Sequence, residues 1–290
     1  MQVQALHASS QAFLLSAPVS TATSRSVSSP HALQIPDRIK ISPEAREQLA
    51  NQAAEEAASQ SVGFLVDLYR QSRSSQERIQ ITQALGALRH PEAVKALEAM
   101  TRTRLDDAHE NALILALGNT RQASAVAVLN DLYRSFWNRA QKRQLVVAAL
   151  GETRSPQALD SLRQAYKDAW NSPAGKDAVI AALGQSRRAE AVPLLHQIYE
   201  DNWNQVSLRQ AVVQAYGQTR SEQGAEKLIQ IFNQHYSQPQ IRQEIITALG
   251  QTRSQTAVLF LQKSYAQLRS EHERQQVLSA LQAAYDKSDN

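Results

Sequence analysis

The chain has 290 residues, a formal net charge of +4 and a hydrophobic content of 42%. Cysteine is absent, which excludes disulfides, thiolate nucleophiles and cysteine metal sites. No apolar run approaches the roughly 18 residues of a membrane-spanning helix, and the charges are interspersed, so the mildly basic balance alone does not indicate a nucleic-acid partner.

The N-terminal segment, residues 1–40, differs in composition from the rest of the chain. It is rich in Ser, and no acidic residue precedes Asp37. Such a segment cannot bury enough apolar surface to order itself, so we predict a disordered tail. As a separate expectation, we predict a cytoplasmic protein. The alternative is an export or organelle-targeting segment, because Ser-rich termini that lack acids serve that purpose.

Residues 41–57 are predicted to form an N-terminal capping helix. Ser42 is a favourable N-cap, and Pro43 suits the first helical position. Arg46 and Leu49 match columns of the repeats that follow, so this helix is interpreted as a half-repeat that closes the exposed end of a stacked array. The repeat domain is expected to start at residue 58, with its first helix opening near Ser61.

Residues 58–285 contain a repeat of about 33 residues. The tripeptide Ala-Leu-Gly, or a near match, recurs at spacings of 32, 33, 33, 33 and 33 residues. A fixed period of this length is typical of arrays in which each helical unit stacks on its neighbours. The glycines of this column are Gly86, Gly118, Gly151, Gly184, Gly217 and Gly250.

Each repeat is predicted to hold two helices, which we name helix A and helix B. Ala125, Val126 and Leu129 have the spacing of one buried helical stripe, which places helix A after each Gly. Residues that favour the N-cap position then recur once per repeat and indicate where helix B starts. These residues are Ser74, Asp106, Asn138, Asn171, Asn204, Ser237 and Ser270.

The predicted fold is therefore all-α. It is a right-handed α-α superhelix, or solenoid, of about seven helical hairpins with an N-terminal capping helix, followed by a polar tail at residues 286–290. The composition agrees with this prediction, because Gly and Pro, which interrupt helices, number only nine each.

The repeat resembles a known family. Ala-Leu-Gly at the end of helix B and Ala-Val-x-x-Leu in the next helix A resemble HEAT repeats, and are most similar to the short HEAT-like repeats of phycobilisome lyases. The resemblance covers roughly residues 54–285. It implies a scaffold, an adaptor or an assembly factor, or else a lyase that handles a bilin on a client protein. One departure is that Thr-Arg, as at Thr120–Arg121, replaces the family's Gly-Asp after helix B.

One basic column follows the Gly column by three residues. Arginine near the end of helix B offsets the negative end of the helix dipole, which is a structural role. The alternative is an edge that binds anionic ligands, either carboxylates or the phosphates of a nucleic acid. After Arg89, the members of this column are Arg121, Arg154, Arg187, Arg220 and Arg253.

A second basic column lies inside helix B. It shares the face of the core stripe, so these side chains are expected to join neighbouring repeats into a polar ladder, as an Arg of helix B does in the HEAT repeats that the chain resembles. Glu110 is the exception in this column. The basic members are Arg46, Arg78, Arg143, Lys176, Arg209, Arg242 and Arg274.

The three Trp residues of the chain, Trp137, Trp170 and Trp203, occupy one repeat position, and Tyr236 continues the row. One interpretation is a hydrophobic staple, in which each ring packs on the fourth residue of helix B. The staple suits Trp203 and Tyr236. It fails for Trp137 and Trp170, because these two would face Lys142 and Gly175. The alternative is an exposed aromatic rail, because Trp and Tyr are frequent binding hot spots.

The outward positions of helix B are small and uncharged in the central repeats and polar in the terminal ones. Such a groove between polar ends suits a partner protein, although Ala is also simply a good helix former. The predicted contact residues on this face are Leu115, Leu145, Ala148, Ala178, Ala181 and Ala211, with the Trp row and Tyr236 at the rim.

Signals for catalysis are weak. The seven His show no paired metal spacing, and neither a phosphate-binding glycine loop nor a nucleophile elbow occurs. No catalytic residue, metal site or cofactor is predicted, and an enzyme is the less favoured interpretation. The sequence predicts a scaffold or adaptor that binds another protein, and it favours nucleic acid less.

Overall fold

The computed structural model describes residues 43–235, 238–268 and 270–286. Every regular element in these ranges is a helix, as predicted. The tail predicted over residues 1–40 and the predicted rim residue Tyr236 lie outside the described residues, as do most of the polar residues predicted after 285. The repeats belong to a compact unit that spans residues 47–290.

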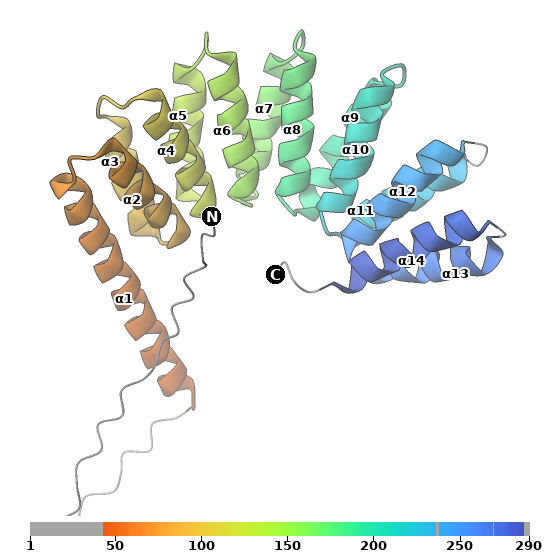
Figure 1. Cartoon of the computed structure of the whole chain (residues 1–290), viewed down its shortest axis with the longest axis horizontal. Coiled ribbons are helices and arrows are strands. Elements are labelled where there is room, and N and C mark those ends of the chain that lie inside the picture. The colour runs from red at the N-terminus through yellow and green to blue at the C-terminus, as the bar shows by residue number, and fades with distance from the viewer. Residues whose placement is uncertain (1–42, 236–237, 269, 287–290) are drawn as a thin grey trace, which may run out of the picture. The chain divides into compact units, whose positions relative to one another are not determined.

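The helices alternate along the chain between helix A, which has an odd number in Figure 1, and helix B, which has an even number. Their bounds are α1 Pro43–Gln71, α2 Ser75–Ala87, α3 Pro91–Thr101, α4 Asp107–Asn119, α5 Ser124–Ser135, α6 Ala140–Glu152, α7 Ala158–Asp168, α8 Pro173–Gln185, α9 Val192–Asp201, α10 Val206–Gln218, α11 Glu222–Gln234, α12 Pro239–Thr252, α13 Gln255–Gln267 and α14 Glu271–Tyr285, with a short 3-10 helix at Ala189–Ala191 before α9.

The helices form two layers. Each helix B packs side by side with the helix B of the next repeat, from α2 to α14, and each helix A from α3 onward packs against the helix B that follows it. Figure 1 shows helices α6 to α14 of the B layer in front and the A layer behind them. This is the stacking of an α-solenoid, and the described residues hold the seven predicted hairpins.

The core lies between the two layers. One leucine of helix A recurs in six successive repeats, and every copy is completely buried. Burying a leucine side chain contributes roughly 1.5–3 kcal/mol relative to leaving it in water, so this column alone is a large part of the stacking energy. Its members are Leu97, Leu129, Leu162, Leu195, Leu228 and Leu261.

The Gly column lets neighbouring B helices approach closely. A Cβ atom at Gly151 would lie 2.6 Å from the carbonyl oxygen of Ala182 in the next helix B, and one at Gly118 would lie 2.8 Å from that of Ala149. Real Cβ atoms do not come this close to backbone. None of the described glycines has a positive φ, so glycine is needed here for the approach of two backbones and not for its conformational freedom.

Helix α1 differs from the prediction. Two helices were expected, one ending at residue 57 and one opening near Ser61, whereas Pro43–Gln71 is a single helix. The Ser61 hydroxyl does not cap a helix, because it donates to the carbonyl oxygen of Ala57 at 2.8 Å, one turn back. No Pro or Gly lies between residues 57 and 62 to end the helix, so the predicted division at 57/58 has no helix break.

The N-caps of helix B are predicted correctly in some repeats and by one residue too early in others. Ser74, Asp106 and Ser270 accept a backbone N–H as predicted. In the central repeats the helix begins one residue later, and the caps are Arg139, Ser172 and Gln205.

A tight turn accounts for this shift. The N–H of Ser172 donates to the carbonyl oxygen of Ala169 at 2.9 Å, and the corresponding bonds close the turns before α6 and α10. Trp170 and Asn171 are therefore the two central residues of a four-residue turn. Asn is as favourable in such a turn as at an N-cap, and for this reason the sequence alone did not distinguish the two positions.

We expect Ser172→Ala to lower the stability of the repeats around α8 by about 1 kcal/mol, the usual value for an N-cap. The reason is that the N–H of Gly175 would lose the Ser172 oxygen, which it contacts at 3.1 Å. Asn171→Ala should cost clearly less, because Asn171 precedes the cap. Hydrogen exchange within α8 measures both losses, and equal losses would contradict the turn described above.

Candidate functional site

The Trp row is exposed. Trp137, Trp170 and Trp203 lie in the turns from helix A to helix B of three successive repeats, and their exposed fractions are 75%, 77% and 75%. These turns lie at the upper ends of the helices in Figure 1. The staple interpretation is therefore wrong, because a stapled ring packs on its helix. The tight turn places each Trp two residues before the cap, where the ring does not reach the fourth helical residue.

Trp170 also borders a hollow on the surface. A cavity of about 480 Å³ lies between α7, α8 and α9, and the Trp170 ring forms part of its wall. Tyr166, Leu194 and Ile198 supply further apolar wall, and the rest of the lining is charged or polar, with Lys176 among three basic residues. Trp170 therefore stands beside a depression of mixed polarity.

The outward face of the B helices is less open than predicted. Leu115 is 43% exposed and Ala181 is exposed, but the other four predicted contact residues are half-buried. Close approach of successive B helices at the Gly column brings these outward positions partly into the seam between helices. The half-buried residues are Leu145, Ala148, Ala178 and Ala211.

Polar hollows interrupt this face. A cavity of about 530 Å³ between α4 and α6 is lined by Asp107, Asn111, Gln141 and Leu145, among others. A second cavity, of about 470 Å³ between α10 and α12, is lined mainly by glutamines and lies toward the C-terminal repeats, where polar outward positions were predicted. The central face therefore has a polar hollow between its apolar points, and its use by a partner stays a prediction.

Glu110, the exception in the second basic column, links α4 to α6. Its carboxylate lies 2.9 Å from the ammonium of Lys142 and 3.0 Å from the guanidinium of Arg139. The Lys142 side chain is 10% exposed and also donates to the side-chain oxygen of Asn111 at 2.6 Å. A buried lysine requires such partners, because an unpaired charge is costly away from water.

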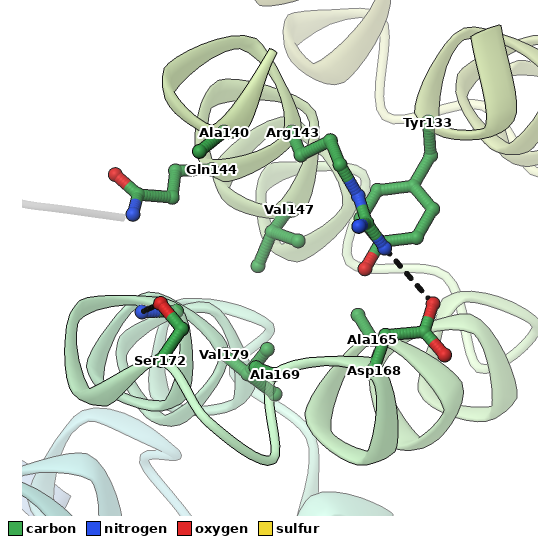
Figure 2. Close-up of a pocket in the computed structure, with 11 residues that line it drawn as sticks. Tyr133, Ala140, Arg143, Gln144, Val147, Ala165, Asp168, Ala169, Ser172 and Val179 are labelled. Atoms are coloured by element: carbon green, nitrogen blue, oxygen red, sulfur yellow. Dashed lines mark hydrogen bonds and ion pairs between the residues drawn. The ribbon is translucent and has the colours of Figure 1, made fainter. Parts of the chain in front are cut away.

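The ladder predicted for the second basic column is present at Arg143. The guanidinium carbon of Arg143 lies 4.1 Å from the centroid of the Tyr133 ring at the end of the preceding helix A. The same guanidinium contacts Asp168 of the next repeat at 2.9 Å (Figure 2). Arg209 stacks on Tyr199 of its own hairpin, at 4.2 Å. These cations are therefore part of the packing within a hairpin, and Arg143 also joins two repeats.

The small cavity in Figure 2 belongs to this ladder. It measures about 110 Å³ and is lined by Arg143, Tyr133, Asp168 and nearby apolar residues. Burial raises the pKa of the Tyr133 phenol, so it stays protonated. An ion pair stacked on an aromatic ring is a structural arrangement, and we assign no catalytic role to it.

The first basic column has an unusual backbone. All six arginines have φ between 50° and 53°, the left-handed conformation that Gly and Asn adopt readily. Left-handed backbone costs other residues roughly 1–2 kcal/mol, whereas a cation at a helix C-terminus contributes about 0.3–1 kcal/mol. The dipole alone therefore does not account for arginine at these turns. The six are Arg89, Arg121, Arg154, Arg187, Arg220 and Arg253.

A Thr precedes four of these arginines and closes helix B, and Ser186 does the same before Arg187. The Thr120 hydroxyl donates to the carbonyl oxygen of Leu117 at 2.7 Å, and Thr153, Thr219 and Thr252 make the same bond at the same length. These hydroxyls satisfy carbonyls that the helix end leaves unpaired. Thr thus has a local structural role in the Thr-Arg pair, which is to close the end of helix B.

One part of the sequence matches a family model. The model, described as HEAT repeats, matches residues 138–207, from the turn before α6 to the start of α10. This segment of the chain therefore consists of HEAT repeats. The Gly and Leu columns of that segment continue through other hairpins, so the same unit is repeated along the array.

Two solved structures are similar to this HEAT-repeat protein. The complex of CpcE and CpcF of phycocyanin lyase from Nostoc sp. is 17% identical, with a TM-score of 0.40 over 88% of this chain and 100% of that chain. Human deoxyhypusine hydroxylase in complex with glycerol is 17% identical, with a TM-score of 0.35 over 82% of this chain and 99% of that chain. No curated protein sequence matches significantly.

Among the described residues, no group of three or more His, Asp or Glu side chains is placed to hold a metal ion. No helix in the described part of the chain is both long and apolar enough to span a bilayer.

Proposed function

We propose that this HEAT-repeat protein is a scaffold or adaptor whose partner protein docks on the Trp row and the adjoining central B face. The observation that supports this most is that Trp137, Trp170 and Trp203 are each about three-quarters exposed at one repeat position. Aromatic side chains dominate the energetics of protein interfaces, and Trp is among the most frequent hot spots.

The Trp row is not needed to build the stack. The hairpin of α3 and α4 has Leu105 in this repeat column and a differently closed turn, with its cap at Asp106, and its helices pack against their neighbours in the same way. Columns that stabilise the stack, such as the buried leucines of helix A, recur from end to end, whereas Trp occurs only in three central repeats. A side chain confined to adjacent repeats and exposed there is better accounted for by a bound partner.

The energy available at this row is large. A Trp side chain buries about 150–250 Å² when it is covered, and apolar area contributes roughly 25 cal/mol per Å² removed from water. The three rings could therefore supply most of the affinity of a specific interface. The cavity beside Trp170, with its mixed apolar and charged lining, offers a place for a side chain of the partner.

Site-specific photo-crosslinking would test this surface. A photoreactive amino acid at Trp170 or Ala181 is expected to capture the partner in cells, and mass spectrometry would then identify it. The same group at Thr247, which is exposed on the B face outside the central repeats, should capture little of that protein. Capture at Thr247 but not at Trp170 would overturn the proposed surface.

A further inference from the structure

The ladder of the second basic column is interrupted beside Trp170. Arg143 joins its own hairpin to the next one by an ion pair with Asp168, at 2.9 Å. One repeat later the equivalent residues are Lys176 and Asp201, and no ion pair joins these two described side chains. A lysine ammonium has no planar fork with which to hold a ring and a carboxylate together. Both groups instead line the cavity of about 480 Å³ beside Trp170.

Positive charge prevails in the wall of this cavity. Lys176 is half-buried, and its ammonium lies 5.8 Å from the centroid of the Tyr166 ring. The Lys167 side chain is exposed and has no ion pair within the described part of the chain. Arg163 has one contact of 3.5 Å with an exposed aspartate of its own helix, and such pairs contribute little. Asp201 is the single acid of the lining, so three cations stand against one anion.

Apolar groups line the same hollow. The side chains of Leu194 and Ile198 are buried and form its inner wall, while the Trp170 ring, 77% exposed, stands at its edge. Burial raises the pKa of the Tyr166 phenol, so this ring is neutral. The cations and the apolar wall therefore meet in one hollow. A ligand that fills it has to present an anion and an apolar group close together.

We propose that this cavity binds the C-terminal residue of the partner protein, with its free carboxylate beside Lys167 and Lys176 and a large apolar side chain against Trp170. The inference rests on the proposed function, because it names the part of the partner that meets the Trp row. A carboxylate forms its stronger hydrogen bonds with cationic donors, and an apolar side chain that covers the exposed ring removes apolar area of both from water.

A chain end suits the hollow better than an internal acidic residue does. In the C-terminal residue the carboxylate and the side chain are attached to the same carbon atom, so both enter one hollow together. Successive side chains of an extended segment point to opposite sides, and adjacent residues of a helix do not face each other. An internal segment would therefore have to supply the acid and the apolar group from two residues at the correct spacing, whereas a chain end needs only one.

Asp201 is the one group of the wall that opposes a carboxylate ligand. It is exposed, so water and salt screen its charge more than that of the half-buried Lys176. The three cations therefore outweigh it, but the repulsion has a measurable consequence. Asp201→Asn should tighten the binding of a carboxylate ligand by about twofold or more and leave the binding of a neutral one unchanged.

Binding of three short peptides to the full chain would test the proposal. The probe is acetyl-Ala-Ala-Phe with a free C-terminal carboxylate, and the neutral reference is the same peptide as its amide. The third peptide, acetyl-Ala-Phe-Glu-Ala-amide, carries its carboxylate on an internal side chain. The variant Trp137→Phe/Trp203→Phe leaves Trp170 as the only Trp of the chain, so its fluorescence reports binding. We expect the probe to bind about tenfold more tightly than its amide at low salt, because hydrogen bonds to charged groups are the stronger ones.

Single charge removals in the same reporter chain locate the site. Lys167→Gln and Lys176→Gln should each weaken the probe by about threefold or more, because each removes a cationic donor, and neither should change the affinity of the amide. Lys95→Gln is the matched control, since Lys95 is exposed on α3, away from the cavity. It should leave the affinity of the probe unchanged, because salt screens exposed charges at a distance. Melting temperatures should be unchanged for Lys167→Gln, whose side chain is exposed.

Several outcomes would overturn the proposal. Equal binding of the probe and its amide would show that the carboxylate is not recognised. Tighter binding of the peptide with the internal Glu would assign the cavity to an internal acidic segment. Displacement of the probe by an equal concentration of inorganic phosphate would show that only negative charge is recognised. Unchanged affinity in both lysine variants would place the binding of the probe elsewhere on the chain.

The captured partner separates this inference from the proposed function. Deletion of its C-terminal residue should weaken the purified complex by about tenfold or more. A partner that is captured at Trp170 but binds equally well without that residue would overturn the inference and leave the Trp row as the docking surface. Failure to capture any protein at Trp170, with the peptides binding as expected, would count against the docking surface and leave the carboxylate site standing.

Discussion

Gly151→Ala is expected to destabilise the central repeats by about 1–3 kcal/mol, the usual cost of overpacking, although alanine is the better helix former. The added methyl group would lie 2.6 Å from the carbonyl oxygen and 2.8 Å from the Cα atom of Ala182. Both atoms are backbone, so no side chain can rotate to make room. Helices α6 and α8 must separate, which loosens the packing between these two repeats.

Gly63→Ala is the matched control for this prediction. Gly63 also lies inside a helix, α1, but nothing lies within 4 Å of a Cβ atom built there. Alanine should therefore stabilise that helix by roughly 0.5–1 kcal/mol. Urea unfolding of the two variants measures both effects, with hydrogen exchange to locate them. If Gly151→Ala were stabilising too, the B helices would not be packed as closely as described.

The repeat architecture could be predicted from the sequence because its determinants are periodic. Two of these determinants, the Gly column and the buried leucine of helix A, recur at a fixed spacing. Each has one physical explanation that fits the repeats in which it occurs. Failures occurred where two explanations use the same residue type. Ser61 resembles an N-cap, but a Ser can also bond one turn back inside a helix.

The candidate surfaces could be predicted only in part. The position of the Trp row was evident, but its exposure depends on a turn that ends one residue later than the Asn column suggests. Leu145 was expected to face a groove, yet its burial depends on how closely α4, α6 and α8 pack. The left-handed backbone of the arginine turns gave no sequence signal, because the residue that usually marks it, glycine, is absent there.

The triple variant Trp137→Ala/Trp170→Ala/Trp203→Ala is expected to lower affinity for the cross-linked partner by about a hundredfold or more, since several hot spots are lost together. Its helical signal and melting temperature should change little, because three-quarters of each ring faces water. Affinity measured on the purified pair, with circular dichroism of the variant alone, separates these two effects.

A second triple variant controls for loss of apolar surface in general. Phe64→Ala/Leu259→Ala/Leu278→Ala removes exposed side chains that are 67%, 56% and 44% exposed and lie outside the central turns. It should bind the partner like the unmodified chain. A comparable loss of affinity would mean that the partner responds to surface hydrophobicity and not to the Trp row.

The central B face requires a probe of its own. Leu115→Glu is suitable because Leu115 is 43% exposed, whereas a charge at the half-buried Leu145 would disturb the packing between repeats. If the partner covers both the turns and the helices, Leu115→Glu should weaken binding by about tenfold, or 1.4 kcal/mol, and Thr247→Glu should not. Should Leu115→Glu abolish binding while the Trp variant binds normally, the B face alone is the docking surface. The exposed rings would then need another explanation.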